Sequence, residues 1–459
     1  MRTFALSLHV LLFATAGFAQ QPSPPVAGSW EGALAVGAAK LRNGVTITVQ
    51  PDGRLTATMD SPDQGAYGLA LSDVGFADGV LKFALRVANG SFEGRLNNAG
   101  TEITGTWTQG MGLPLVLKKV EKLTKPNRPQ EPKPPFPYRS EAITFTNTAG
   151  QAVLAGTLTV PEGKGPFPAV VLITGSGAQN RDEEIFGHKP FLVIADHLTR
   201  HGIAVLRYDD RGVGKSTGNF ATATSEDFAA DAWAAWQALS GRPEIDPKRI
   251  GLLGHSEGGL IAPMLAAAHP EVAFVVMVGG PGVTGEQIIL RQSEAIMKAS
   301  GASDEVVAAT ADRQKQAINI LREETSLPRI IERLSAIPAS GSKEAVDAAV
   351  KQWSSPWLRF FLFHDPAPAL TKVRCPVLAV GAELDLQVPP EQNLPVIDAA
   401  LRQGGNKDVT IVRLPGLNHL LQPAKTGLPG EYAQIDVTVA PVALDTIAAW
   451  MQKRTGLAK

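Results

Sequence analysis

The pentapeptide Gly254-His255-Ser256-Glu257-Gly258 constrains the fold of this 459-residue chain more than any other feature. A short apolar run, 249–253, precedes it, and an alanine-rich run with helical character, 260–268, follows it. A serine flanked by glycines at such a junction is typical of a sharp turn from a strand into a helix, because side chains at the glycine positions would block the turn and the approach of the helix. The pattern therefore predicts a nucleophilic Ser256 at a strand-to-helix turn.

The C-terminal two thirds of the chain alternate apolar runs of strand length with helical patterns. Expected strands are 169–173, 203–208, 250–253, 274–278, 377–380 and 409–414. Expected helices are 191–200, 226–239, 260–268, 393–402 and 442–453. This alternation predicts a mostly parallel sheet with helices on both faces, over residues 139–459. The stretch 287–363 is helical, charged and free of strand patterns, and it is too long for a normal crossover, so we expect a helical cap at about 285–365.

The N-terminal region has a different period. Short alternating runs such as 45–49, 55–59, 81–87 and 102–108 are separated by Asn43-Gly44, Asp52-Gly53, Asp78-Gly79 and Asn89-Gly90. Such pairs adopt positive φ at low cost, so residues 25–120 are expected to form hairpins that close into a small all-β barrel or sandwich. Trp30, Phe92 and Trp107 are interpreted as its core, with a ligand groove as the alternative.

Prolines and lysines dominate the next segment, 121–138. Proline cannot donate to a sheet or continue a helix, so this segment is predicted to be a stiff, extended linker that contains the domain boundary.

A serine hydroxyl needs a base to accept its proton, and that base needs a carboxylate to hold it. Three histidines follow Ser256 in the sequence. His269 lies too close along the chain and His364 lies at the end of the expected cap, whereas His419 follows the last apolar strand. Asp385 and Glu383 both follow the preceding strand. Asp385 is preferred as the carboxylate because it lies further into the loop.

An oxyanion hole needs two backbone N–H donors directed at the developing negative charge. The N–H of Glu257, next to the nucleophile, is one expected donor. The second is expected from Ile173-Thr174-Gly175-Ser176-Gly177, with Ser176 first and Gly177 next, because glycines let the backbone approach a substrate closely.

Several other functions are disfavoured. The run Arg211–Ser216 ends like a phosphate-binding loop, but Asp209 stands where the first glycine is required, and a buried Asp–Arg network is the preferred interpretation. No histidine-rich or Glu-x-x-His pattern indicates a metal, and no cofactor is expected. A formal charge of −1 gives no field that would attract nucleic acid. Cys375 is the only cysteine, and it is expected to be buried and unreactive.

Residues 1–20 carry one arginine, an apolar stretch over 4–13 and small residues at 17 and 19. This is the pattern of a cleaved signal peptide, residues 1–19, and it predicts export to the periplasm or the medium. The apolar run is short for a bilayer, so no stable membrane insertion is expected.

These blocks together resemble bacterial α/β-hydrolases of the carboxylesterase and serine aminopeptidase-like group. The resemblance covers 139–459 and rests on 174–177, 207–216, 254–259, 381–389 and 417–419. It implies an α/β-hydrolase fold with a helical cap, behind a small β-barrel, and hydrolysis of short-to-medium acyl esters by Ser256, His419 and Asp385. An exported serine peptidase is the alternative within the fold. Glycan or cell-wall binding by the β domain is the alternative from another class, and the oligomeric state is left open.

Overall fold

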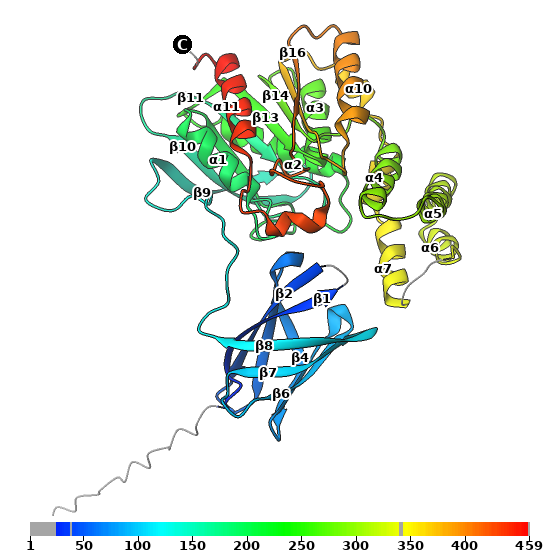
Figure 1. The fold of residues 1–459 in the computed structure, drawn as a ribbon. Helices are drawn as coiled ribbons and strands as arrows, with labels where there is room; N and C mark the ends of the chain where they lie inside the picture. The colour runs from blue at the N-terminus through cyan, green and yellow to red at the C-terminus, as the bar shows by residue number, and fades with distance from the viewer. Residues whose placement is uncertain (1–23, 37–38, 339–342, 458–459) are drawn as a thin grey trace, which may run out of the picture. The chain divides into compact units, whose positions relative to one another are not determined.

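A computed structural model describes residues 24–36, 39–338 and 343–457 of the chain. The expected signal peptide, 1–19, lies outside these residues. The described chain folds into two compact units, the first comprising residues up to 61 together with 66–124, and the second comprising 62–65 and the residues from Lys125 onward (Figure 1). Each unit has its own hydrophobic core.

The first unit is a closed barrel in which each strand pairs antiparallel with the next and β8 pairs back to β1. Its strands are β1 (Gly28–Val36), β2 (Ala39–Val49), β3 (Leu55–Ser61), β4 (Ala66–Ala77), β5 (Val80–Leu85), β6 (Gly90–Leu96), β7 (Glu102–Gln109) and β8 (Met111–Val120). The prediction of a small all-β barrel is confirmed. Closure leaves none of these eight strands with a free edge.

Aromatic side chains fill the barrel. Trp30, Phe92 and Trp107 are 0%, 2% and 3% exposed and belong to one core cluster. The indole N–H of Trp30 donates to the carbonyl of Val26 at 2.8 Å, which satisfies its polar atom inside the core. These three rings therefore form core, as expected, and do not line a groove.

One of the four expected turns is wrong. Asp52-Gly53, Asp78-Gly79 and Asn89-Gly90 lie at chain reversals, but Asn43-Gly44 lies inside β2. A Cβ on Gly44 would come within 2.8 Å of the Leu123 side chain, so the glycine makes room for a neighbouring side chain.

The second unit is built on an eight-stranded sheet with the order β16-β15-β14-β13-β11-β12-β10-β9. Its strands are β9 (Tyr138–Asn147), β10 (Ala152–Pro161), β11 (Phe167–Ile173), β12 (Ala204–Tyr208), β13 (Ile245–His255), β14 (Val275–Val278), β15 (Val377–Ala382) and β16 (Val409–Leu414). The strands from β11 to β16 pair in parallel, whereas β10 pairs antiparallel with both β9 and β12. The mostly parallel sheet is confirmed; β9 and β10 were not anticipated.

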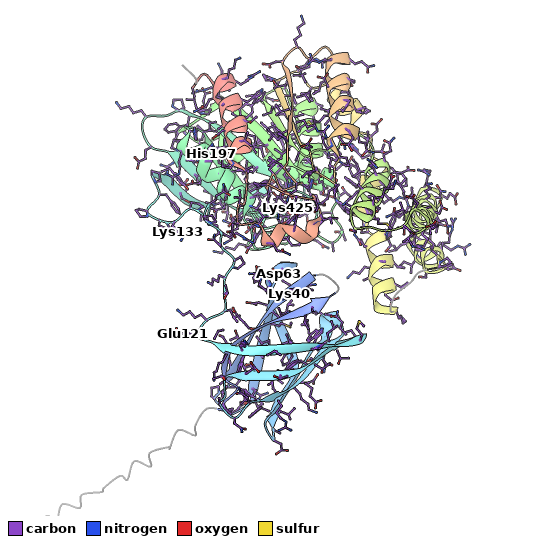
Figure 2. The ribbon with its side chains drawn as sticks, viewed as in Figure 1. Lys40, Asp63, Glu121, Lys133, His197 and Lys425 are labelled. Atoms are coloured by element: carbon purple, nitrogen blue, oxygen red, sulfur yellow. The ribbon has the colours of Figure 1, made fainter. Side chains whose placement is uncertain are left out.

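Helices cover both faces of this sheet. The helices of the unit are α1 (Pro190–Arg200), α2 (Ser225–Ser240), α3 (Glu257–Ala268), α4 (Gly285–Ala299), α5 (Asp304–Glu323), α6 (Leu327–Ser335), α7 (Lys343–Trp353), α8 (Pro356–Phe363), α9 (Ala367–Leu370), α10 (Pro390–Gln403) and α11 (Pro441–Thr455). α1 and α11 share one core cluster, and α2, α3 and α10 share another. His197, labelled in Figure 2, belongs to α1, and its Nε2 lies 3.4 Å from Oδ1 of Asp445 in α11.

α4 to α8 all fall between β14 and β15, in the stretch expected to form a cap. Apolar side chains from α4, α5, α6 and α8 share a cluster with Leu260 of α3. The inserted helices therefore pack on the helix that follows the serine turn.

The proline-rich segment is attached to the second unit along part of its length. The Arg128 guanidinium donates to the carbonyls of Phe186, Gly187, Ala433 and Ile435. The Gln130 side chain accepts from the N–H groups of Thr438 and Val439. Residues 128–130 are thus held by hydrogen bonds, which a linker interpretation based on proline content does not foresee.

Candidate active site

The serine turn is strained and closely packed. β13 ends at His255, Ser256 has φ 54° and ψ −117°, and α3 begins at Glu257. A Cβ on Gly254 would lie 1.9 Å from the carbonyl oxygen of Gly258, so no other residue fits there. A positive φ at a non-glycine residue costs about 1–3 kcal/mol and persists only where its surroundings impose it.

The expected carboxylate and base form a buried pair. His419 Nδ1 lies 2.7 Å from Asp385 Oδ2, and both residues are less than 5% exposed. The other oxygen of Asp385 accepts the N–H groups of Gln387 and Val388 at 2.9 and 2.8 Å. Both oxygens of Asp385 act as acceptors, so we assign the Nδ1 proton to His419, which leaves its Nε2 as the nitrogen that can accept a proton.

The strand order brings this pair to the edge of the sheet that carries Ser256. Ser256, Asp385 and His419 follow the carboxyl ends of the parallel strands β13, β15 and β16. The Ser256 N–H donates to the carbonyl of Val278, at the end of the intervening strand β14. A Cβ on the next residue, Gly279, would lie 3.3 Å from both the Asp385 carboxylate and the His419 ring. The end of β14 thus contacts both the serine turn and the Asp385–His419 pair.

The loop after β11 lies against the nucleophile. A Cβ on Gly175 would come within 3.1 Å of the Ser256 Cβ. The N–H of Gly175 donates to Glu183 Oε1 at 2.7 Å and is therefore occupied. Ser176 and Gly177 come next, and Gly177 has φ 100°, a conformation that favours glycine. The two expected oxyanion donors from this loop thus lie directly after a residue that is fixed beside Ser256.

Glu257, the residue after the nucleophile, begins α3, where its N–H has no intrahelical partner. Its side chain is buried, and Oε1 accepts the Ser225 hydroxyl at 2.6 Å and the Trp357 indole N–H at 2.8 Å. Burial raises the pKa of Glu257 despite these two donors. Since Trp357 lies in α8, the side chain of Glu257 ties the inserted helices to the start of α3.

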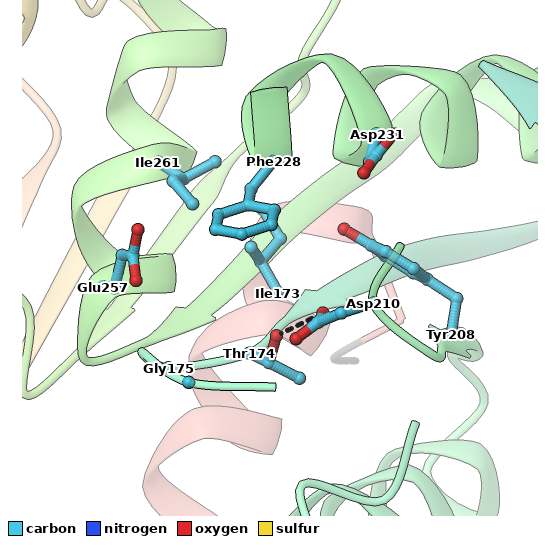
Figure 3. Close-up of a pocket in the computed structure, with 10 residues that line it drawn as sticks. Ile173, Thr174, Gly175, Tyr208, Asp210, Phe228, Asp231, Glu257 and Ile261 are labelled. Carbon is cyan, nitrogen blue, oxygen red and sulfur yellow. Dashed lines mark hydrogen bonds between the residues drawn. The ribbon is translucent and has the colours of Figure 1, made fainter. Parts of the chain in front are cut away.

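A narrow pocket lies between the Gly175 loop and Glu257 (Figure 3). Asp210 lines it and accepts the Thr174 hydroxyl at 2.8 Å and the Gln179 N–H at 2.9 Å. Burial raises the pKa of Asp210 to about 8, and the carboxylates of Glu257 and Glu183 add to the effect. Asp210 is therefore largely protonated at neutral pH, which reduces the negative charge beside the oxyanion loop.

The expected Asp–Arg network is present behind this pocket. Arg181 pairs with Asp209 at 2.6 Å, and Arg211 pairs with Asp231 at 2.7 Å. The N–H of Lys215 donates to Asp209, so the segment that resembles a phosphate-binding loop is folded around a carboxylate. That arrangement braces loops and repels phosphate.

Glu383 and Cys375 have other roles. Glu383 accepts the N–H of Gly416 at 3.0 Å and so fixes the start of the loop that carries His419. Cys375 is partly rather than fully buried, and this burial raises the pKa of its thiol to about 12, which keeps it protonated and unreactive.

Within the described ranges, no three His, Cys, Asp or Glu side chains gather as a metal site would require, and no helix is long and apolar enough to span a bilayer.

The serine aminopeptidase S33 family matches residues 189–330, from the start of α1 into α6. The second unit has the fold of an α/β-hydrolase. The hydrolase is 29% identical over 305 residues to esterase EstD of Thermotoga maritima, a match that covers 65% of this chain and 66% of EstD. It is 29% identical over 147 residues to esterase FrsA of Yersinia pestis, covering 32% of this chain and 33% of FrsA. The hydrolase thus spans just under two thirds of EstD and about a third of FrsA.

Among solved structures, the Pyrococcus furiosus esterase Pf2001 is 16% identical with a TM-score of 0.44, covering 72% of this chain and 99% of the esterase. The α/β-hydrolase GrgF from Penicillium is 19% identical with a TM-score of 0.45, covering 69% and 99%. The family match and the similarity to EstD confirm the predicted resemblance to the carboxylesterase and serine aminopeptidase-like group.

Sequence reasoning missed one charged pair at the hydrolase site. Glu183 Oε1 lies 2.9 Å from His255 Nδ1, and His255 Nε2 lies 3.0 Å from the carbonyl oxygen of His419. His255 is the second residue of the pentapeptide, but no spacing rule connects it with Glu183. The contacts of Thr174 with Asp210 and of Trp357 with Glu257 could not be predicted either, because each joins segments far apart in the sequence.

Proposed function

We propose that the hydrolase is a serine esterase that cleaves short-to-medium acyl esters through an acyl-enzyme, with Ser256 as nucleophile, His419 as base and Asp385 as its orienting carboxylate. The buried Asp385–His419 pair next to the strained serine turn is the observation that carries this proposal. EstD and FrsA, both named esterases, add support for the reaction class.

In the proposed reaction, the Ser256 hydroxyl attacks the ester carbonyl while His419 Nε2 takes its proton. The N–H of Glu257 and an N–H from Ser176 or Gly177 stabilise the oxyanion. The tetrahedral intermediate collapses, and His419 returns the proton to the leaving alcohol. Water, deprotonated by His419, then releases the acid and restores Ser256. Asp385 keeps the His419 ring oriented and compensates its charge in both steps.

The test compares wild-type enzyme with Ser256→Ala on p-nitrophenyl acetate and butyrate. The variant should retain its circular dichroism spectrum and lose more than about 10³-fold in kcat/KM, since removing the nucleophile leaves only oxyanion stabilisation and binding. A Ser256→Ala variant with full activity would refute the nucleophile assignment. The aromatic side chains of α8, among them Trp357 and Phe361, favour an uncharged acyl group, so a chain-length series should peak below long acyl chains.

A serine peptidase is the second candidate, and the S33 family match favours it. The same triad hydrolyses amides, and the acidic Glu257 beside the pocket offers an acceptor for a substrate N–H. Aminoacyl and prolyl p-nitroanilides, assayed beside the esters, separate the two candidates. A kcat/KM higher on the anilides than on the esters would replace the esterase proposal.

We further propose that the hydrolase is exported by its first 19 residues, on the grounds of their sequence pattern. Cell fractionation with N-terminal sequencing of the mature protein tests this, and a mature chain that begins at Met1 in the cytoplasm would overturn it. The small-molecule ester is the expected partner. Glycan binding by the barrel is disfavoured by its buried aromatic rings, and a polysaccharide pull-down with the full chain tests it.

A further inference from the structure

Glu183 and His255 form a second buried ion pair next to the catalytic one. Both side chains are largely buried, with side-chain exposures of 4% and 10%. Glu183 lies in the loop between β11 and α1, ten residues beyond Ile173, and His255 is the last residue of β13. Neither residue takes part in the proposed chemistry, so the pair requires an explanation of its own.

The hydrogen bonds define the charge of His255. Its Nδ1 faces the Glu183 carboxylate, and its Nε2 faces the His419 carbonyl oxygen. A carbonyl oxygen only accepts, so Nε2 donates; with Nδ1 donating to the Glu183 carboxylate as well, the ring is an imidazolium. Burial opposes this charge, but the adjacent Glu183 carboxylate outweighs it, and the pKa of His255 is raised.

The pair connects three parts of the site. Glu183 Oε1 also accepts the N–H of Gly175, next to the expected oxyanion donors. His255 directly precedes the nucleophile. Its second N–H holds the backbone of His419, whose side chain faces Asp385. One ion pair therefore fixes the oxyanion loop, the nucleophile turn and the histidine loop relative to one another.

Glu183 itself is held in an unfavourable backbone conformation, with φ 51°. Such a conformation in a non-glycine residue persists only when surrounding contacts compensate for it. The two hydrogen bonds to Oε1 are contacts of this kind.

We propose that Glu183 and His255 act as a positioning pair that aligns the oxyanion donors and the base with Ser256. This inference rests on the proposed function, because alignment matters only if Ser256 is the nucleophile. The pair contacts neither the reacting ester nor Ser256 Oγ in the proposed reaction, so it acts through the residues it holds.

Glu183→Gln is the decisive variant, since it removes the charge at nearly constant volume. Its kcat for p-nitrophenyl butyrate should fall about 10- to 100-fold while KM changes less than about 3-fold, because misplacement by about 1 Å harms the transition state more than ground-state binding. Glu184→Gln, the same substitution at the exposed neighbour, should leave both constants unchanged.

Reaction of Ser256 with a p-nitrophenyl phosphonate gives the concentration of folded, competent enzyme and the rate of nucleophilic attack. The rate constant for labelling should fall in Glu183→Gln by about the same factor as kcat. His255→Gln should behave similarly, and the double variant should lose little more than the worse single variant, because the two residues act as one unit. Glu183→Asp should recover part of the labelling rate.

Imidazole nitrogen and proton resonances provide a readout that does not depend on turnover. A doubly protonated ring, lost in His255→Gln, is expected in the folded protein at pH 7. A neutral His255 ring, additive losses in the double variant, or undiminished labelling in Glu183→Gln would each overturn the positioning role while leaving the esterase proposal standing. A wild-type enzyme that neither turns over esters or amides nor reacts with the phosphonate would overturn the proposed function and the positioning role with it.

Discussion

The barrel and the hydrolase unit bury different kinds of side chain. In the barrel, the core cluster is aliphatic and aromatic, and the buried polar residues within the described parts of its strands, Asn43 and Ser61, are uncharged. The hydrolase buries charged groups as well, including Glu183, Asp210 and Glu257 near the serine turn. Burying a charge is costly unless it is paired or hydrogen-bonded, so a fold retains such groups where they serve another purpose.

This difference indicates which part of the molecule holds a reactive site. Apolar packing accounts for the core cluster of the barrel, and in the hydrolase unit it accounts for the side chains on the two faces of the sheet. At the carboxyl edge of that sheet, Asp385 and His419 are paired, Glu183 and His255 are paired, and Asp210 has its pKa raised to about 8. Perturbed and paired titratable groups concentrated at one edge are typical of an active site.

Among the substitutions that test this comparison, Asp385→Asn should have the largest effect, a loss of ester hydrolysis. The amide would favour protonation of the wrong ring nitrogen of His419, and kcat/KM should fall about 10³- to 10⁴-fold, as it does when this carboxylate is replaced in serine triads. Glu383→Gln is the matched control, because Glu383 only accepts a backbone N–H in the same loop region and should cost less than about 10-fold. Ester turnover at saturating and limiting substrate measures both. Equal losses in the two variants would contradict the assignment of Asp385.

Trp30→Ala tests whether apolar packing in the barrel serves stability alone. The ring is 0% exposed, so its removal should destabilise the barrel by about 3–5 kcal/mol through lost burial and an unfilled cavity. Calorimetry should show a lower barrel transition, while kcat below that transition stays within about 2-fold of wild type, because no charged site group is touched. Trp30→Phe, which keeps much of the ring volume, should lower the transition less. A parallel loss of kcat in Trp30→Ala would show that the barrel contributes to catalysis.

The sequence predicted what depends on local pattern and chain order. The strands β11 to β16, the helices that flank them, the serine turn and the residues Asp385 and His419 all follow from apolar runs, glycines and the order of blocks. β9 was missed because it is an edge strand with several intermediate or exposed positions. β10 is mostly buried, but Gly156, Thr157 and Thr159 interrupt its apolar run, so the sequence pattern does not stand out.

Contacts between segments distant in the sequence could not be predicted from the sequence. Nothing in the sequence near Glu183 indicates that it meets His255, 72 residues away. Trp357 and Glu257 are separated by 100 residues, and they meet only because α8 folds back onto α3. Burial raises the pKa of Glu257, whereas the Glu183 carboxylate outweighs burial and raises the pKa of His255, and both effects exist only in the folded chain.

Asp210→Asn should give the smallest and most specific effect. The folded-state pKa of Asp210 is raised to about 8 from the usual 3.8, so between these values the folded protein holds a proton that the unfolded chain has released. Native proton binding exceeds unfolded proton binding in this window, and the contribution of Asp210 to stability therefore falls as pH rises from about 4 to 8.

The variant cannot titrate at this position, and its amide nitrogen replaces one acceptor for Thr174 or Gln179. It should be less stable than wild type at pH 5, and the difference in Tm should shrink by about 2 °C or more on going to pH 8. Thermal unfolding of both proteins across this range measures the change. A difference in Tm that stays constant, or that grows toward pH 8, would mean that Asp210 is ionised in the folded protein and that the oxyanion loop lies beside a full negative charge.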